Sequence, residues 1–230
     1  MQAVILAAGK GTRMGNLTEK VPKPMLLYKG KNLICHKLDV LPDSIDEIIL
    51  VVGYLKEVII GYFGNSYKGK KITYVDMPEL LGTAWAIKLC ESHIKNSFIV
   101  MMGDDIYDAR GVKEAIDESA EWTLTVKKFD EARRGSVVIS SEGFFLGIDE
   151  EVREVGNEHG AEGAMFVNTG LYKLNRKIFN YALVKLPDKN EYGLPQTMAS
   201  ASHDIPIKVL YTDEWKQVTS PEDVDPIQSL

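Results

Sequence analysis

Short apolar runs alternate with helix-like segments through the first half of the chain. The runs are rich in β-branched and aliphatic residues and predict strands, whereas the segments between them repeat apolar residues three and four apart, as helices do. The predicted strands cover 3–7, 47–52, 71–75 and 97–102, and the predicted helices 31–41, 55–63 and 83–92. Alternation at this spacing indicates βαβ units with right-handed crossovers. We therefore expect an α/β protein, with a Rossmann-like three-layer fold and a mostly parallel central sheet.

The second half of the chain has a different pattern. Short, partly alternating strands are predicted with little helix between them, followed by a longer strand, two helices and a final strand. These strands cover 122–127, 137–140, 144–148, 165–174 and 207–211, and the helices 176–186 and 194–202. No internal repeat and no low-complexity linker interrupts the sequence. We expect a single domain over residues 1–230, with a small β-rich subregion added to the parallel sheet.

The composition argues against several classes of protein. With 27 Lys and Arg against 33 Asp and Glu, the net charge is −6 and the pI about 5.3, whereas a nucleic-acid-binding surface is normally basic. Two cysteines and four scattered histidines make neither a disulfide framework nor a zinc site. The longest apolar runs are far shorter than the roughly 20 residues that a membrane span needs. We expect a cytoplasmic protein without nucleic-acid or membrane partners.

A glycine-rich stretch, AAGKGTRMG, follows the first predicted strand. A dinucleotide-binding loop has the pattern GxGxxG and opens directly into a helix, but here the third glycine comes one place late. Pro22 and Pro24 then exclude a regular helix, because proline lacks the N–H and clashes with the preceding turn. A phosphate at this loop would be held by loop amides and by the cations Arg13 and Lys23. A plain strand-to-helix turn with a solvated basic loop is the alternative.

Asp104 comes shortly after the fourth predicted strand. Because the carboxyl ends of parallel strands meet at one edge of a sheet, we expect Asp104 and the glycine-rich loop to face the same crevice. A carboxylate there suits Mg²⁺, which prefers one or two protein carboxylates together with phosphate oxygens. Asp105 is the alternative ligand, but side chains of neighbouring strand residues point to opposite faces. A purely structural role for Asp104 would be to cap the helix near Gly111.

These features coincide with the motifs of a known family. The stretch AVILAAGKGTRM…VPKPML closely resembles the signature of the sugar-1-phosphate nucleotidylyltransferases, also called nucleotide-sugar pyrophosphorylases. Further matches follow in the order of that family: VVGY at 51–54, LGTA at 81–84, GDD at 103–105, NTGLY at 168–172, EYGLP at 191–195 and WxxVxSPED at 215–223. The N-terminal motif is highly specific, and the later motifs reinforce it by their order and spacing. The resemblance covers nearly the whole chain.

The resemblance implies an enzyme that joins a nucleoside triphosphate to a sugar 1-phosphate and releases pyrophosphate. It implies that Arg13 binds the leaving group, that Lys23 holds phosphates at the reacting centre, and that Asp104 is a ligand of Mg²⁺. The nucleotide would contact Leu6, Ala7, Ala8, Gly9, Gly11, Thr12, Arg13, Gly82 and Thr83. Thr83 is also the expected N-cap of the helix at 83–92. Whether the protein forms a homo-oligomer is left open.

The motifs for the acceptor are less complete. The resemblance places the phosphorylated sugar at Gly135, Glu150, Asn168 and Thr169. The family's lysine that binds the sugar phosphate is expected near Glu150, but the sequence there is acidic, and Arg153 is the candidate substitute.

Three further positions depart from the family. Met77 stands where the family has a base-reading glutamine, Trp85 where it has a small residue, and Gln217 where it has a second metal-binding aspartate. A thioether cannot make a bidentate contact with a base, and the amide of Gln217 can bind a metal only through a neutral oxygen. Trp85 either narrows the pocket or simply packs. These departures leave two alternatives open: a cytidylyltransferase acting on a polyol or other alcohol phosphate, and a nucleotide-binding module with little turnover.

Overall fold

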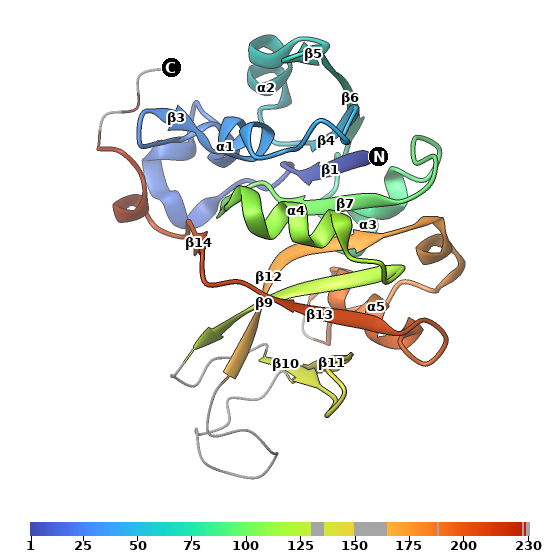
Figure 1. Ribbon diagram of the computed structural model, residues 1–230. Helices are drawn as coiled ribbons and strands as arrows, with labels where there is room; N and C mark the ends of the chain where they lie inside the picture. The colour runs from blue at the N-terminus through green and yellow to red at the C-terminus, as the bar shows by residue number, and fades with distance from the viewer. Residues whose placement is uncertain (130–135, 150–164, 188, 227, 229–230) are drawn as a thin grey trace.

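The computed structural model describes residues 1–129, 136–149, 165–187, 189–226 and 228. In the centre of its main sheet, the parallel strands β7, β1, β4 and β6 lie side by side in that order (Figure 1). They cover Gln2–Leu6 (β1), Glu47–Val52 (β4), Lys70–Asp76 (β6) and Phe98–Met102 (β7). The predicted parallel sheet is confirmed, and the first and fourth predicted strands are direct neighbours.

The β-rich second half continues this sheet beyond β7. Strand β12 pairs antiparallel with β7, β9 and β10, β11 lies beyond β10, and β13 runs parallel to β9. A register shift between Asn168 and Tyr172 allows the one long strand to serve several partners. The bounds are Trp122–Phe129 (β9), Ser136–Ile139 (β10), Phe145–Asp149 (β11), Met165–Leu174 (β12) and Ile207–Tyr211 (β13). The subregion is therefore an extension of the central sheet.

Five short strands complete the described β-structure. Strand β5 pairs with β6 at the end of the main sheet, and two small ribbons are formed by β2 with β3 and by β8 with β14. Their bounds are Leu27–Tyr28 (β2), Lys31–Asn32 (β3), Ser66–Tyr67 (β5), Asp105–Tyr107 (β8) and Trp215–Gln217 (β14). The ribbon of β8 and β14 joins a segment that follows β7 to one near the other end of the chain.

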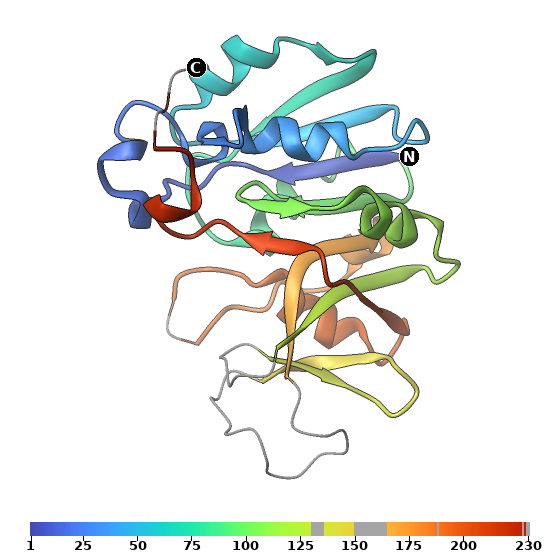
Figure 2. The same cartoon turned by 60° about the vertical axis from the view of Figure 1, so that its left-hand side comes forward.

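Helices cover both faces of the sheet, which gives the predicted three layers (Figures 1 and 2). Successive strand residues point to opposite faces: Ala3 and Ile5 belong to the core beneath α1, α2 and α4, whereas Val4 belongs to the core beneath α3 and α5. The helices are Leu33–Asp39 (α1), Lys56–Phe63 (α2), Thr83–Leu89 (α3), Ala109–Asp117 (α4) and Leu194–Ala201 (α5). Short 3-10 helices span Thr12–Thr18 (η1), Lys23–Met25 (η2), Arg176–Asn180 (η3) and Pro221–Asp223 (η4). None of the described helices has the length and apolar character needed to cross a lipid bilayer.

The predicted helix at 176–186 is only partly correct. It is helical over η3, after which the chain extends and Lys185 forms an isolated bridge with Tyr192. The N–H of Val184 donates to the hydroxyl of Thr197 at 3.1 Å, and the N–H of Leu186 donates to a carbonyl oxygen in the returning segment. Because these two N–H groups find acceptors elsewhere in the fold, they do not need the carbonyl oxygens that a helix would offer.

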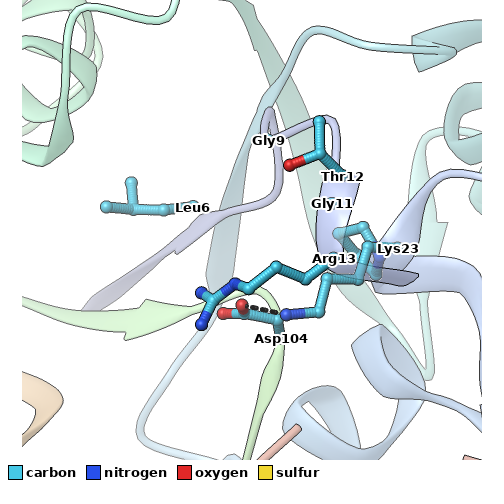
Figure 3. Close-up of a pocket in the computed structure, with 8 residues that line it drawn as sticks. Leu6, Gly9, Gly11, Thr12, Arg13, Lys23 and Asp104 are labelled. Carbon is cyan, nitrogen blue, oxygen red and sulfur yellow. Dashed lines mark hydrogen bonds and ion pairs between the residues drawn. The ribbon is translucent and has the colours of Figure 1, made fainter. Parts of the chain in front are cut away.

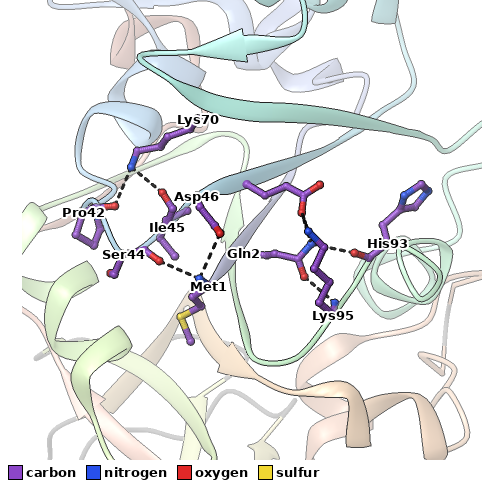
Figure 4. A network of polar contacts seen from close by, with 10 residues as sticks. Met1, Gln2, Pro42, Ser44, Ile45, Asp46, Lys70, His93 and Lys95 are labelled. Carbon is purple, nitrogen blue, oxygen red and sulfur yellow. Dashed lines mark hydrogen bonds and ion pairs between the residues drawn. The ribbon is translucent and has the colours of Figure 1, made fainter.

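The amino ends of the parallel strands are joined by a polar network (Figure 4). The side-chain amide of Gln2 donates to the carboxylate of Glu47 at 3.0 Å and to the carbonyl oxygen of His93 at 2.9 Å. Lys95 donates to the same carboxylate at 2.7 Å, and this hydrogen bond lowers the pKa of Glu47. The network ties β1 and β4 to the turn before β7 at the edge opposite to the glycine-rich loop.

The sequence predicted Thr83 as the N-cap of α3, and this prediction is wrong. The N-cap is Gly82, and the hydroxyl of Thr83 instead accepts a hydrogen bond from the N–H of Leu194 at 2.9 Å. Leu194 begins α5, so its N–H has no acceptor within its own helix. Thr83 therefore satisfies the amino end of a different helix.

Replacing Thr83 tests this contact. Thr83→Val leaves the N–H of Leu194 without an acceptor, and we expect it to lower the free energy of unfolding by about 1–3 kcal/mol. Thr83→Ser keeps a hydroxyl at the same place and should lose clearly less. Urea denaturation of both variants measures the difference, and equal losses would contradict the role assigned to the hydroxyl.

Candidate active site

Strands β1 and β7 end side by side and bring the glycine-rich loop next to Asp104. The five residues of β1 pair in register with those of β7. One residue later, the N–H of Gly103 donates to the carbonyl oxygen of Leu6 at 2.9 Å, and a Cβ at Gly103 would lie 2.4 Å from that oxygen. Only glycine fits so close to the neighbouring backbone. The two segments that carry the predicted chemistry therefore leave the sheet as neighbours, as expected.

A pocket of about 230 Å³ lies between these two segments. Its lining consists of Leu6, Gly9, Gly11, Thr12, Arg13, Lys23, Pro24 and Asp104. Figure 3 shows the side chains of Arg13 and Lys23 reaching toward the carboxylate of Asp104. All of these residues except Pro24 were candidates from the sequence, and Pro24 belongs to the same Pro-Lys-Pro stretch as Lys23. Two cations and one carboxylate thus face one small cavity.

Lys23 and Asp104 form an ion pair in this pocket. The Nζ atom of Lys23 lies 2.6 Å from Oδ2 of Asp104, and the two side chains are 7% and 37% exposed. Lys23 lies in η2 between two prolines. At Gly11, where φ is +67°, an added Cβ would lie only 2.6 Å from the Cβ of Lys23. The proline-flanked backbone and the buried stem fix the position of the ammonium group. In such a pair the ammonium group of Lys23 can bind an anion, and the carboxylate of Asp104 can bind a cation beside it.

The loop that carries Arg13 is anchored from inside the protein. Met14, the next residue, is completely buried, whereas the side chain of Arg13 is exposed. The hydroxyl of Thr18 donates to the carbonyl oxygens of Gly11 and Gly15, and the hydroxyl of Tyr54 donates to the carbonyl oxygen of Thr18 at 2.9 Å. The cation is therefore presented to the pocket from a supported backbone.

Residues 218–225 pack on the same loop from the other side (Figure 2). Val218 and Val224 form a small buried cluster with Met14, Leu26 and Leu33. The carboxylate of Asp225 accepts hydrogen bonds from the N–H groups of Lys29 and Gly30, at 2.8 Å and 2.7 Å. Residues 218–225, from a distant part of the chain, thus cover the segment that bears Arg13 and Lys23.

Ala7 and Ala8, two of the predicted nucleotide contacts, support the pocket rather than line it. Both are buried. The N–H of Ala7 donates to the carbonyl oxygen of Val51 at 2.8 Å, and the carbonyl oxygen of Ala8 accepts from the N–H of Tyr54 at 3.1 Å. Their backbone polar groups hold the turn after β1 against the turn after β4.

Gly82 and Thr83 lie at the start of α3, outside the pocket. A Cβ at Gly82, where φ is +95°, would lie 2.5 Å from the carbonyl oxygen of Tyr192. Nearby, the partly buried Trp85 packs against the core beside the ring of Tyr192, with the ring centroids 6.4 Å apart. The side chain of Met77 is buried in the same core. Met77 thus faces the core in this structure, whereas Trp85 packs on the core and stays partly exposed.

The predicted acceptor residues are Gly135 and Glu150, which lie outside the described residues, and Asn168 and Thr169 on β12. Asn168 is partly buried, and its amide donates to the hydroxyl of Tyr172 at 2.6 Å and accepts from the N–H of Gly170 at 2.9 Å. Thr169 is buried, and its hydroxyl donates to the carbonyl oxygen of Thr125 at 2.9 Å. The side chain of Thr169 therefore faces the interior in this structure, and its contact with an acceptor stays a prediction.

Asp104 and Asp105 point in different directions, as strand alternation predicts. Asp104 lines the pocket, whereas Asp105 is only 3% exposed and accepts a hydrogen bond from the indole N–H of Trp215 at 3.1 Å. Burial raises the pKa of Asp105 to about 8. The capping role considered for Asp104 belongs to Asp108, whose carboxylate accepts from the N–H of Gly111 at 2.8 Å. Asp104 is therefore the carboxylate that a ligand can reach.

Gln217, the other predicted metal ligand, is not among the residues that line the pocket. The pairing of β14 with β8 places Gln217 opposite Asp105, and its side chain is exposed. Throughout the described part of the chain, no three or more His, Cys, Asp or Glu residues gather where they could hold a metal ion. Of the two predicted metal ligands only Asp104 lines the pocket, so a cation there would depend on Asp104 and on oxygens of the ligand.

One buried charged residue near the site was not among the candidates. Lys37 lies on α1 and is completely inaccessible to solvent. Burial lowers its pKa to about 8, against the opposing effect of the charges of Asp105 and Asp104. The sequence carried a signal for it, because Lys37 follows Leu33 by four residues and Ile34 by three, which places it on the apolar face of the helix.

Comparisons with known proteins agree with this geometry. A family model described as nucleotidyl transferase matches residues 2–223. The chain is 34% identical to the UTP–glucose-1-phosphate uridylyltransferase AglF of Haloferax volcanii, over 98% of this chain and 94% of the relative. It is 28% identical, over 97% of its length, to the bifunctional protein GlmU of Methanococcus aeolicus, of which it spans 53%. The crystal structure of HddC from Yersinia pseudotuberculosis superposes with a TM-score of 0.72 and 26% identity, covering 96% of this chain and 95% of HddC. In agreement with the resemblance to sugar-1-phosphate nucleotidylyltransferases, the chain belongs to the nucleotidyl transferase family.

Proposed function

We propose that the protein transfers a nucleotidyl group from a nucleoside triphosphate to a sugar 1-phosphate, giving a nucleotide sugar and pyrophosphate. The observation that carries the proposal is the convergence of Arg13, Lys23 and Asp104 on one pocket at the carboxyl edge of the sheet. Membership of the family supports the transfer reaction. The printed name of the relative AglF supports a sugar phosphate as acceptor and makes UTP with glucose 1-phosphate the first pair to test.

The reaction needs positioning and charge neutralisation. An oxygen of the sugar phosphate attacks the α-phosphorus of the nucleotide, and the bond from that phosphorus to the bridging oxygen of the departing pyrophosphate breaks. Arg13 would bind the pyrophosphate as its negative charge grows, and Lys23 would hold phosphate oxygens at the reacting centre. The glycines of the loop would let backbone N–H groups approach the phosphates.

The pocket fits Mg²⁺. Asp104 presents a partly exposed carboxylate in the pocket, and Gln217 has an exposed amide on β14, opposite the neighbouring residue Asp105. Mg²⁺ takes one or two such ligands together with phosphate oxygens and water. When bound, Mg²⁺ would neutralise charge on the phosphate groups. Lys23 supplies a positive charge beside Asp104 in this structure. We infer that Lys23 leaves Asp104 for the phosphates when nucleotide and cation bind.

Pyrophosphate release tests the proposal. The four nucleoside triphosphates are combined with sugar 1-phosphates and with polyol phosphates in the presence of Mg²⁺. Release that requires a sugar 1-phosphate supports the proposed function. Release from CTP with a polyol phosphate alone would replace it by the cytidylyltransferase alternative, and nucleotide binding without release from any pair would indicate a binding module.

Asp104→Asn should abolish most of the activity. The substitution removes the negative charge from the side chain that we propose as the metal ligand, and a contribution of several kcal/mol corresponds to a loss of roughly 10²-fold or more. The matched control is Asp117→Asn, because Asp117 is an exposed aspartate whose partner is Lys113 on α4. Both rates are measured by pyrophosphate release with folded proteins. Near-normal turnover in Asp104→Asn would exclude Asp104 from the site.

Arg13→Ala and Lys23→Ala should weaken the stabilisation of the protein by a nucleoside triphosphate. Each variant removes a cation that faces the pocket, so the rise in melting temperature on adding nucleotide and Mg²⁺ should be smaller than in the unmodified protein. Lys20→Ala is the control, since Lys20 is an exposed lysine of the same loop that does not line the pocket. An undiminished rise in both pocket variants would show that the loop is a solvated basic segment.

Gln217→Asp should lower the Mg²⁺ concentration that gives half-maximal rate. The substitution adds a second carboxylate near Asp104, so the cation would depend less on oxygens of the nucleotide. The alternative is that Asp213 or Asp223 already supplies this charge, in which case the added carboxylate only increases repulsion. A titration of rate against Mg²⁺ decides. An unchanged or higher half-maximal concentration in Gln217→Asp would contradict the prediction.

A further inference from the structure

Tyr107 is a buried tyrosine whose hydroxyl the proposed reaction does not use. It is the last residue of β8, and it belongs to the core beneath α1, α2 and α4, where it is only 6% exposed. Its hydroxyl accepts a hydrogen bond from the N–H of Met102 at 3.1 Å and donates one to the carbonyl oxygen of Thr169 at 2.9 Å. The phenol therefore acts as donor and as acceptor at once, and both of its partners are main-chain groups.

The first of these hydrogen bonds closes the segment that carries Asp104. Met102 is the last residue of β7, and Gly103 and Asp104 form the turn that leads into β8. The hydroxyl of Tyr107 joins the end of β8 back to the end of β7. On the side of β1, the N–H of Gly103 donates to the carbonyl oxygen of Leu6. Asp104 thus lies in a closed loop, residues 102–107, that is tied to β1.

The second hydrogen bond ties the same loop to β12. Residues 98–100 of β7 form the ladder with β12, and farther along β12 its register with β9 changes over residues 168–172, which we call the shifted segment. At Gly170 in this segment φ is +73°, and a Cβ there would lie 2.3 Å from Cγ of Met102 and 3.4 Å from the hydroxyl oxygen of Tyr107. Where the regular pairing is interrupted, the hydroxyl of Tyr107 satisfies one main-chain group on each strand.

The shifted segment is itself held by side-chain hydrogen bonds. The amide of Asn168 accepts from the N–H of Gly170 and donates to the hydroxyl of Tyr172. The hydroxyl of Thr169 donates to a carbonyl oxygen of β9. Irregular strand segments of this kind are common next to active sites, where they redirect side chains. The carbonyl oxygen of Thr169 is therefore a fixed point to which the loop 102–107 is attached.

We propose that Tyr107 is a positioning residue of the active site. Its hydroxyl holds the loop 102–107 to β12, and through this loop it keeps the carboxylate of Asp104 beside Lys23 in the pocket. Without the hydroxyl, the loop keeps its attachment to Leu6 but loses the one to Thr169, so the carboxylate is displaced. The effect on turnover rests on the proposed function, whereas the effect on the place of Asp104 does not.

Tyr107→Phe removes the hydroxyl and keeps the ring. The matched control is Tyr74→Phe, because the hydroxyl of Tyr74 also donates to a main-chain carbonyl oxygen, that of Gly64, and because β4 and β1 separate its strand β6 from β7. We expect kcat of Tyr107→Phe to fall roughly tenfold to a hundredfold, as small misplacements in a site do. The KM for the nucleoside triphosphate should stay near that of the unmodified protein, since Arg13 and Lys23 are retained. Tyr74→Phe should keep its kcat.

The ¹³C NMR signal of the Asp104 carboxyl group gives a readout that needs no activity. It is assigned as the aspartate carboxyl signal that Asp104→Asn lacks. Because the ammonium group of Lys23 lies 2.6 Å from this carboxylate, a displaced carboxylate has a different chemical shift. We expect the signal to move in Tyr107→Phe and to stay in place in Tyr74→Phe.

The outcomes separate the two proposals. If the Asp104 signal moves in Tyr107→Phe while even the unmodified protein releases no pyrophosphate, the proposed function fails and the positioning role stands. If the unmodified protein is active, the inference needs both effects, and an unchanged kcat or an unchanged Asp104 signal in Tyr107→Phe overturns it. An equal fall of kcat in Tyr74→Phe would overturn it as well.

Should Tyr107→Phe not fold, Asn168→Ala decides. This variant removes the side chain that holds the shifted segment and leaves Tyr107 in place. The Asp104 signal must then move if the segment holds Asp104 through Tyr107. An unchanged signal in Asn168→Ala would show that the hydroxyl serves only the stability of the fold.

Discussion

The parallel pairing of β1 with β7 is the constraint on which the site depends. Because Gly103 has no side chain, its N–H can donate a hydrogen bond to the carbonyl oxygen of Leu6. The segments that follow the two strands therefore begin side by side. Arg13 and Lys23 lie on one of these segments and Asp104 on the other. Three charges that are up to 91 positions apart in the chain become neighbours through a backbone contact that carries no chemistry itself.

The central sheet and most of the pocket could be predicted from the sequence because both follow from local patterns. The buried strands β1, β4 and β7 are continuous apolar runs, which is how a strand covered by helices on both faces reads. The topological rule that ligands bind at the carboxyl ends of parallel strands then located the loop and Asp104. The choice of Asp104 over Asp105 also needed only the alternation of side chains along the chain.

What the sequence could not supply are contacts between segments that lie far apart. The hydroxyl of Thr83 reads as a cap for its own helix, but it is Leu194 of another helix that needs an acceptor there. The position of Lys37 on the apolar face of its helix could be read from the sequence, but its complete burial is seen only in the fold. Of the two adjacent carboxyl groups, Asp104 forms an ion pair with Lys23 in the pocket, whereas Asp105 accepts a hydrogen bond from the indole of Trp215 in the interior.

The packing of residues 218–225 on the pocket loop sets an order of events during synthesis. The hydrogen bond between Lys29 and Asp225 joins positions 196 residues apart, a separation that takes roughly 10 to 40 s to translate at the usual rates of about 5–20 residues per second. Strands β1, β4 and β7 have all left the ribosome well before that time, so the sheet can assemble first. The nascent chain therefore already contains Arg13, Lys23 and Asp104 before residues 218–225, which pack on their loop, have been translated. The cover of the pocket is therefore added only after residues 218–225 have been translated.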